Sequence, residues 1–238
     1  MNKIYKSKQT MSTYVIGDIH NRYQALEQCI ERSPINKNTD TLISLGDICD
    51  GPQLGTDKVI EQLLEFENLI VCMGNHDGEW FRNYLKTGEE LPIWIHQGGY
   101  QTLASYDYKR ENIPLSHIDL INDELPYYID DNNNLYVHGG FDERYPMRNQ
   151  DLLDLIWNRE LACSYCNNPQ KDPIKPYNHV FLGHTSTQFA SCNNSNDKPI
   201  TSQNVTLVDT GAGWIGKLTI MNVDTLEYWQ SDEQLAEP

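Results

Sequence analysis

The chain places a short apolar run directly before potential metal ligands in Tyr14-Val15-Ile16-Gly17-Asp18-Ile19-His20, and this combination indicates the fold. Three apolar residues lead into a glycine, and side chains able to bind a metal follow at once. The same order returns at 41–50, which ends in Gly46-Asp47-Ile48-Cys49-Asp50, and at 69–77, which ends in Gly74-Asn75-His76-Asp77. Short continuous apolar runs are typical of strands buried on both faces of a sheet. The repeat therefore predicts buried strands at 14–16, 41–45 and 69–73, each ending in polar side chains.

Helix-like segments separate these three strands. Tyr23 to Arg32 places Leu26 and Ile30 one turn apart, and Thr56 to Phe66 carries its apolar residues on one stripe. Strands that alternate with helices indicate βαβ units, and hence a layered α/β fold. Further strands are predicted at 135–137, 180–182, 205–208 and 217–221, with an eighth at 226–229.

The rest of the chain is predicted to be helix and loop within one domain that spans 1–238. Residues 79–123 read as helical with breaks at Pro92 and Pro114, because proline ends or kinks a helix. Residues 163–178 and 191–204 are rich in Asn, Pro, Ser and Lys, so we interpret them as loops or insertions. A polar N-terminal extension, 1–12, and a mobile acidic tail, 231–238, are expected to flank the domain.

The composition narrows the class of protein. The 238 residues are 39% hydrophobic, which is enough for one sizeable core. The formal net charge is −16, and a field of this sign repels nucleic-acid phosphates, so we expect no nucleic-acid partner. No apolar run reaches the length of a membrane helix, and the first twelve residues lack the apolar centre of a signal peptide. These features predict a cytoplasmic protein without a membrane partner.

The cysteines divide into two sets. Cys29, Cys49 and Cys72 lie in apolar or periodic stretches and are expected to be buried. Cys163 and Cys166 form a CxxC pair in a polar region. A structural zinc site usually has four ligands, and the chain has no second CxxC, so free thiols are the favoured interpretation.

A group of aromatic residues in the middle of the chain leaves two interpretations open. These side chains could line a substrate groove or pack into the core. Their helical spacing favours the core. The residues are Trp80, Phe81, Tyr84 and Trp94.

Five predicted strands end beside potential metal ligands. Because the carboxyl ends of strands form the binding sites of open α/β sheets, we expect these groups to converge at one edge. A glycine beside each group lets the chain turn sharply off its strand. Carboxylate and imidazole donors suit Mn, Fe or Zn, and two such ions held close together can clamp a phosphate and activate water. The groups are Asp18 with His20, Asp47 with Asp50, Asn75 with His76, His138, and His184.

In this order the five motifs resemble the calcineurin-like metallophosphoesterase superfamily, and within it the phosphoprotein phosphatase branch. That branch includes phage and bacterial serine/threonine phosphatases and the symmetrical diadenosine tetraphosphatases. The resemblance covers 14–223, and the ordered set is specific although each motif alone is weak. It implies a four-layer α-β-β-α sandwich with two central mixed sheets. It also implies two divalent metal ions per chain, with Mn expected first and Fe or Zn as alternatives.

The resemblance assigns a role to each motif residue. His76 would protonate the leaving-group oxygen as general acid, and Asp50 would orient it. Asp47 would bridge the two ions, and a metal-bound hydroxide would attack phosphorus. Asn75 would bind metal and contact the substrate phosphate. The implied metal ligands are Asp18, His20, Asp47, Asn75, His138 and His184.

Segments outside the metal set also match the branch. Residues 155–159 resemble the segment that supplies a phosphate-gripping arginine, here Arg159, whose planar guanidinium suits two phosphate oxygens. Residues 209–212 resemble the segment that closes the site, and 97–103 reads as a helix start with no chemistry of its own. Asp77 could support the acid, but a loop cap is the favoured interpretation.

The chain departs from the branch at the phosphate clamp. Gly51 stands where the pattern has an arginine, and Asn21 where it has a glycine. Arg159 becomes the main clamp candidate, with Arg22 or Arg82 as alternative substitutes. The first substrate hypothesis is a phosphomonoester, above all phosphoserine or phosphothreonine in a protein. A nucleotide such as diadenosine tetraphosphate or a cyclic nucleotide is the alternative, and a non-catalytic metal-dependent scaffold is less favoured because every expected ligand is in place.

Overall fold

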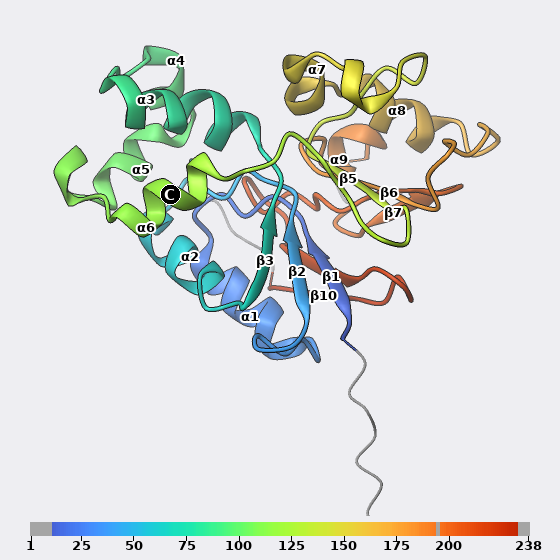
Figure 1. Ribbon diagram of the computed structural model, residues 1–238, viewed down its shortest axis with the longest axis horizontal. Helices are drawn as coiled ribbons and strands as arrows, with labels where there is room; N and C mark the ends of the chain where they lie inside the picture. The colour runs from blue at the N-terminus through green and yellow to red at the C-terminus, as the bar shows by residue number, and fades with distance from the viewer. Residues whose placement is uncertain (1–10, 194–195, 233–238) are drawn as a thin grey trace, which may run out of the picture.

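The computed structural model describes residues 11–193 and 196–232, which build two five-stranded mixed sheets (Figure 1). The first sheet has the order β10-β9-β1-β2-β3 and the second β4-β5-β6-β8-β7. The strands of the first sheet are β1 (Thr13–Ile16), β2 (Thr41–Ser44), β3 (Asn68–Val71), β9 (Thr219–Asn222) and β10 (Tyr228–Gln230). Those of the second are β4 (Tyr128–Ile129), β5 (Leu135–Val137), β6 (Val180–Leu182), β7 (Ile200–Ser202) and β8 (Val205–Leu207).

Parallel strands joined by helices form the first half of the fold, as predicted. β1, β2 and β3 pair in parallel, with Val15 opposite Ile43 and Ile43 opposite Ile70. The crossovers are α1 (Tyr23–Arg32) and α2 (Thr56–Leu63), and their buried faces include Leu26 and Ile60. All eight predicted strands are present, with ends that move by one or two residues.

Alternation of side chains along the strands creates three apolar cores between four layers (Figure 1). In β1, Tyr14 and Ile16 pack toward α1 and α2, whereas Val15 packs between the two sheets. Across that inner core the rings of Tyr136 and Phe181 stack with centroids 5.2 Å apart. The second sheet buries its other face against α7 (Leu152–Trp157), α8 (Glu160–Asn167) and α9 (Thr187–Ala190). The four-layer α-β-β-α sandwich with two mixed sheets is thus confirmed.

A run of short helices occupies the middle of the chain and packs beside α2. Its members are η1 (Asn75–Phe81), α3 (Arg82–Thr87), α4 (Pro92–Trp94), η2 (Ile95–Gly99), α5 (Tyr100–Ala104), η3 (Arg110–Asn112) and α6 (Leu115–Asn122). The predicted breaks are confirmed, because α4 begins at Pro92 and α6 follows Pro114. The aromatic group of this region is buried, as the helical spacing predicts: Trp80, Phe81, Tyr84 and Trp94.

Two predicted loops contain regular structure. Residues 163–178 begin inside α8, whose residues Leu161, Ala162 and Tyr165 are buried against the second sheet. Residues 191–204 contain β7, an edge strand that pairs antiparallel with β8. The strands β4 and β7 escaped prediction because two or three residues carry no readable period, and pairing with a neighbour defines them.

The predicted flanking segments fall largely outside the described residues, which exclude 1–10 and 233–238. At the start of the predicted tail the structure differs from the prediction. Ser231 is buried and exchanges hydrogen bonds with Leu218, and Asp232 pairs with Arg32 at 2.7 Å. These contacts attach 231–232 to the first sheet and α1. None of the helices in the described ranges is long and apolar enough to cross a membrane.

The thiols lie as the sequence predicts for free cysteines. Cys29, Cys49 and Cys72 are buried in the cores. Cys163 and Cys166 lie half-buried on α8, and within the described ranges they belong to no group of donors spaced to hold a metal ion. The free-thiol interpretation of the CxxC pair is therefore the one that the geometry supports.

Candidate metal centre and active-site cleft

Five strand ends from both sheets deliver the candidate ligands to one place. Asp18 and His20 follow β1, Asp47 follows β2, and Asn75 follows β3 in the first sheet. The second sheet supplies one imidazole after β5 and another after β6, from His138 and His184. A cleft of about 740 Å³ opens above them, and its lining includes His20, Asp47, Asn75, His76 and His184. The predicted convergence at one edge of the fold is what the structure describes.

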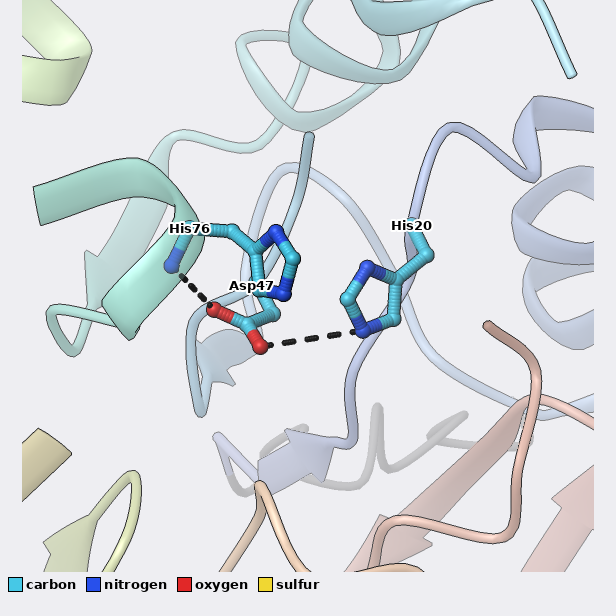
Figure 2. A group of neighbouring side chains, drawn as sticks. All are labelled: His20, Asp47 and His76. Atoms are coloured by element: carbon cyan, nitrogen blue, oxygen red, sulfur yellow. Dashed lines mark hydrogen bonds and ion pairs between the residues drawn. The ribbon is translucent and has the colours of Figure 1, made fainter. Parts of the chain in front are cut away.

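Asp47 lies at the centre of this arrangement. Its Oδ2 is 3.3 Å from Nε2 of His138 and 3.6 Å from Nε2 of His20. Its Oδ1 accepts a hydrogen bond from the backbone N–H of His76 at 3.0 Å (Figure 2). Two groups of donor atoms, each spaced within 4.8 Å, share this carboxylate: His20, Asp47 and His76 in one, and Asp47, His138 and His184 in the other.

Glycine next to the strands makes the close approach sterically feasible. Gly46 has φ of +97°, a conformation that L side chains rarely adopt, and it turns the chain off β2. A Cβ at Gly74 would collide with the carboxylate of Asp47. A Cβ at Gly183 would come within 2.5 Å of Asp18 Oδ1. Side chains at these positions would push the carboxylates out of the site.

Backbone carbonyls fix which ring nitrogen of each imidazole faces the cleft. His20 donates from Nδ1 to the carbonyl of Asp50 at 2.8 Å, and His138 donates from Nδ1 to the carbonyl of Leu45 at 2.7 Å. With Nδ1 engaged in this way, Nε2 of each ring points toward Asp47, and a metal ion that displaced its proton would find the lone pair facing the site. This is the arrangement that a metal-binding imidazole requires.

Burial leaves atoms in the site whose lone pairs or negative charge a cation would satisfy. Nε2 of His184 is buried and forms no hydrogen bond with the described residues. Burial, together with His138 and Arg159 nearby, lowers the pKa of His184 to about 2, so the ring is neutral and able to bind a metal. Burial and the neighbouring Asp209 raise the pKa of Asp18 well above its usual range. These donors fit divalent metal ions, which would offset the crowding of carboxylates.

The pKa values of Asp47 and His138 also reflect the balance between burial and neighbouring charges. Burial alone would raise the pKa of Asp47, but the imidazoles of His138, His76 and His20 outweigh it and hold that pKa well below its usual range. Burial opposes protonation of His138, yet the carboxylates of Asp47 and Asp18 raise its pKa to about 9. Asp47 is therefore the anion on which the positive groups of the site converge.

His76 and Asp50 form a second hydrogen-bonded pair beside the ligand group. Nδ1 of His76 lies 3.1 Å from Oδ2 of Asp50, whose side chain is fully buried. The His76 ring packs edge-on against Trp80 and His20, with centroids 4.7 Å and 5.0 Å away. Burial lowers the pKa of His76, but Asp47 and Asp50 together raise it above its ordinary value.

Asp77 serves as a loop cap, in agreement with the favoured interpretation. Its carboxylate is fully buried and accepts hydrogen bonds from the backbone N–H groups of Ile48 and Cys49, each at 3.0 Å. It thereby braces the loop that carries Asp47.

Of the three arginines considered as phosphate clamps, Arg159 alone lines the cleft. It donates from Nη1 to the carbonyl of His184 at 2.6 Å, and its guanidinium lies 5.5 Å from the ring centroid of Phe189. The prediction that Arg22 could replace the missing arginine is wrong, because Arg22 is buried and donates hydrogen bonds to the carbonyls of Ala212 and Trp214.

The prediction that Arg82 could act as the phosphate clamp is also wrong. Its guanidinium donates to the carbonyl of Ile121 and pairs with Glu124 at 2.8 Å, away from the cleft. Sequence alone could not exclude these two arginines, because burial and partners decide where a long side chain points.

The loop after β8 contributes residues that the motif pattern did not single out as chemical groups. Asp209 is buried in the cleft wall and accepts a hydrogen bond from the N–H of Gly211 at 2.9 Å. Gly213 packs on the ring of His20, and Trp214 extends from the same loop with 79% of its surface exposed. Asp209 follows a strand in the same way as the five motifs, which is the signal that could have identified it.

Comparison with known proteins agrees with this geometry. The chain matches the family of calcineurin-like phosphoesterases over residues 11–208. A serine/threonine-protein phosphatase 1 of Salmonella typhimurium is 23% identical over 226 residues, covering 92% of this chain and 94% of that protein. A symmetrical bis(5'-nucleosyl)-tetraphosphatase of Buchnera aphidicola is 24% identical over 294 residues, covering 94% and 99%. A solved structure of a candidate diadenosine tetraphosphatase is similar with a TM-score of 0.65 at 15% identity, covering 94% of each chain.

The chain therefore belongs to the calcineurin-like phosphoesterase family, as the ordered motifs indicate. It is a metal-dependent phosphoesterase, and members of this family use a dinuclear metal site. The two donor groups that share Asp47 are the part of the described chain that fits such a site.

Proposed function

We propose that this chain is a phosphatase that hydrolyses phosphomonoesters, with phosphoserine and phosphothreonine in proteins as its first substrates. The observation that supports it best is the cluster of imidazoles around Asp47 at the base of a cleft, where one of them, His76, also pairs with the buried Asp50. The Salmonella relative is named as a serine/threonine phosphatase and aligns over 92% of the chain.

The proposed ligands divide between the two metal positions. Asp18 and His20 would hold one ion, Asn75, His138 and His184 would hold the other, and both would share Asp47. When bound, the ions supply Lewis acidity, neutralise charge on the phosphate oxygens and make a water acidic enough to act as nucleophile. Mn is the proposed metal, because oxygen and imidazole donors suit it and no thiolate lies in the donor groups.

His76 is the proposed general acid. Its Nδ1 is engaged by Asp50, so Nε2 is the atom that transfers a proton to the departing oxygen. Both oxygens of the Asp50 carboxylate are buried, which keeps water from competing for the imidazole. In this assignment Asp50 orients the ring and stabilises its charged form.

Arg159 and Asn75 are the proposed phosphate contacts. The guanidinium of Arg159 is anchored at one nitrogen by the carbonyl of His184, which leaves its other N–H groups for the phosphate. The amide of Asn75 is buried next to His138, with Oδ1 3.1 Å from Nε2. With Gly51 in place of the pattern's arginine, Arg159 is the cation that the cleft offers the substrate.

A reducing compartment, the cytoplasm, is the proposed location. All six cysteines lie within the described ranges, and each is a free thiol. Free thiols are the usual state of cysteine in the cytosol, where thioredoxin and glutathione keep them reduced.

A nucleotide substrate is the second candidate, and the exposed rim of the cleft favours it. Trp214 and Phe189 line the cleft with 79% and 59% of their surfaces exposed, and they offer flat faces on which a base can stack. The Buchnera relative is named as a symmetrical bis(5'-nucleosyl)-tetraphosphatase. Phosphoprotein and nucleotide substrates both present a phosphate to the same proposed metals.

A substrate panel with added Mn tests this function. p-Nitrophenyl phosphate, a phosphoserine peptide, diadenosine tetraphosphate and a cyclic nucleotide are compared by kcat/KM, first with the unaltered protein and then with Asp47→Asn and His76→Asn. We expect turnover of the phosphopeptide, a loss of activity on every substrate in Asp47→Asn, and in His76→Asn a loss on the phosphopeptide that p-nitrophenyl phosphate, with its stable leaving anion, does not share. Full activity in both variants would overturn the mechanism, and turnover of the nucleotides alone would replace the first substrate class with the second.

A further inference from the structure

The helical segment 92–104 contacts the carboxylate of Asp50 through two side chains. Trp94 donates from its indole Nε1 to Oδ2 of Asp50 at 2.7 Å. Thr102 donates from its hydroxyl to Oδ1 at 2.6 Å and accepts the backbone N–H of Asp50 at 3.0 Å. Both residues lie in a region for which the sequence indicated packing and no chemistry.

Backbone geometry brings this segment directly over Asp50. Gly98 has φ of +106°, and a Cβ there would come within 2.5 Å of the carbonyl carbon of Asp50. Gly99 packs against the indole of Trp94, where a Cβ would lie 2.6 Å from the ring. Two consecutive glycines therefore allow the kinked segment η2, in which Gln97 and Gly98 leave helical geometry, to approach both the indole and the Asp50 backbone.

The two donors hold the carboxylate at both oxygens. Thr102 engages Oδ1, whereas Trp94 and Nδ1 of His76 share Oδ2. A carboxylate held by one contact can rotate about its Cβ–Cγ bond, but two donors on different oxygens fix its plane. The side chain of Asp50 is fully buried, so no water replaces a lost partner at low cost.

Packing alone does not require these hydrogen bonds. Trp94 is fully buried and packs on Tyr84 with ring centroids 5.3 Å apart, contacts that phenylalanine would largely keep. Thr102 is buried too, and valine has nearly its shape. What these residues add beyond volume is an N–H and an O–H aimed at the carboxylate that orients His76.

We infer that Trp94 and Thr102 are positioning residues for the acid pair: they fix Asp50 so that it holds the Nδ1–H of His76 while the charged ring presents its Nε2–H to the leaving oxygen. The inference rests on the proposed role of His76 as general acid. Its consequence is selective. Substrates whose leaving group needs a proton depend on Trp94 and Thr102, and substrates whose leaving group departs as a stable anion do not.

The test compares two substrates that differ in the basicity of the leaving group. The variants Thr102→Val and Trp94→Phe are assayed with Mn on phenyl phosphate and on p-nitrophenyl phosphate. We expect kcat/KM for phenyl phosphate to fall about tenfold or more and kcat/KM for p-nitrophenyl phosphate to fall less than about twofold. Thr102→Ser keeps the hydroxyl and should restore the phenyl phosphate rate.

A matched control is Tyr106→Phe, which removes a buried hydroxyl from the same helical region. The hydroxyl of Tyr106 is hydrogen-bonded to Nδ1 of His117 at 2.9 Å. The inference would be overturned if Thr102→Val lost equal activity on both substrates. It would also be overturned if Tyr106→Phe lost as much activity on phenyl phosphate as Thr102→Val, because the two contacts would then serve only the stability of the fold.

His76→Asn separates this inference from the proposed function. If His76→Asn shows no dependence on the leaving group, the acid assignment itself fails. If the rate of His76→Asn depends on the leaving group and the rates of the Trp94 and Thr102 variants do not, only the positioning role fails. A readout without turnover is the ¹⁵N spectrum of the His76 ring in metal-free protein, taken at a pH above the pKa of the ring, where the ring carries one proton. We expect a lower population of the Nδ1–H tautomer in Thr102→Val than in unaltered protein, and an unchanged population would contradict positioning.

Discussion

Oδ1 of Asp47 accepts a hydrogen bond from the backbone N–H of His76 at 3.0 Å, so the proposed bridging ligand also fixes the start of the segment that carries the proposed acid. Its other oxygen faces His20 and His138 across the site. One carboxylate thus links β2, β3 and the second sheet. Substitutions there should affect the metals and the acid together.

Asp47→Asn is expected to lower kcat by at least about 100-fold and to reduce bound metal, because a neutral amide offsets no charge between two cations. The amide oxygen can still accept the N–H of His76, so the fold should survive. Steady-state kinetics and metal content by mass spectrometry measure the two effects. Asp224→Asn, at an exposed turn, is the control and should change neither. Normal metal content in Asp47→Asn would argue against a shared ligand.

Chelation is expected to destabilise the protein. Asp18, Asp47 and Asp209 are buried together, and cations offset their mutual repulsion. Mn at a hundred times its dissociation constant should add about 2.7 kcal/mol to the free energy of unfolding. Thermal melts with EDTA and with Mn check this, and Asp47→Asn should show a smaller shift. Identical melting temperatures with and without Mn in the unaltered protein would contradict a metal site built from these carboxylates.

The sequence predicts well which side chains gather at the cleft, because each part of its signal is local. A short apolar run, a glycine and a candidate ligand such as Asp18 or His184 lie within a few residues, and parallel strands then bring their ends to one edge. The contacts of Trp94 and Thr102 with Asp50 join residues 44 and 52 positions apart. No local pattern reports such a contact, since it depends on how one helical segment packs over another loop.

The failures at the phosphate clamp have the same origin. Arg22 and Arg159 look alike in sequence, and only the fold reveals that one is buried under the 212–214 loop while the other lines the cleft. Sequence did not predict the end of helix α8, because its Cys, Ser and Asn residues are poor helix formers. Burial of Leu161 and Tyr165 outweighs that preference.

Arg159→Ala is expected to raise KM for phosphate esters about tenfold, since it removes the cation that lines the cleft. Arg159→Lys should restore little of the affinity, because an ammonium cannot make the paired contacts of a guanidinium. Kinetics on a phosphopeptide measure both variants, and Arg144→Ala, which removes an exposed arginine outside the cleft, is the control that should keep its KM. Unaltered KM in Arg159→Ala would move the clamp to another residue.

Arg82→Ala is expected to destabilise the fold by about 3 kcal/mol, because it leaves the fully buried carboxylate of Glu124 without its cation. Urea denaturation measures the free energy of unfolding, and KM for the folded fraction should stay unchanged. Arg144→Ala removes an exposed pair with Asp142 and should leave stability unaltered. A raised KM in Arg82→Ala with normal stability would restore Arg82 as a clamp candidate.

Trp214→Ala distinguishes the two substrate classes. The indole is 79% exposed on the loop that packs against His20, so it can contact a substrate without supporting the core. If a base stacks on it, kcat/KM for diadenosine tetraphosphate should fall about tenfold or more while that for p-nitrophenyl phosphate holds. Trp214→Phe should keep part of the nucleotide activity, and Tyr145→Ala, an exposed aromatic residue outside the cleft, should keep all of it. Equal rates on the dinucleotide for Trp214→Ala and unaltered protein would show that no base stacks on Trp214. Phosphoproteins would then be the substrate class that the cleft supports.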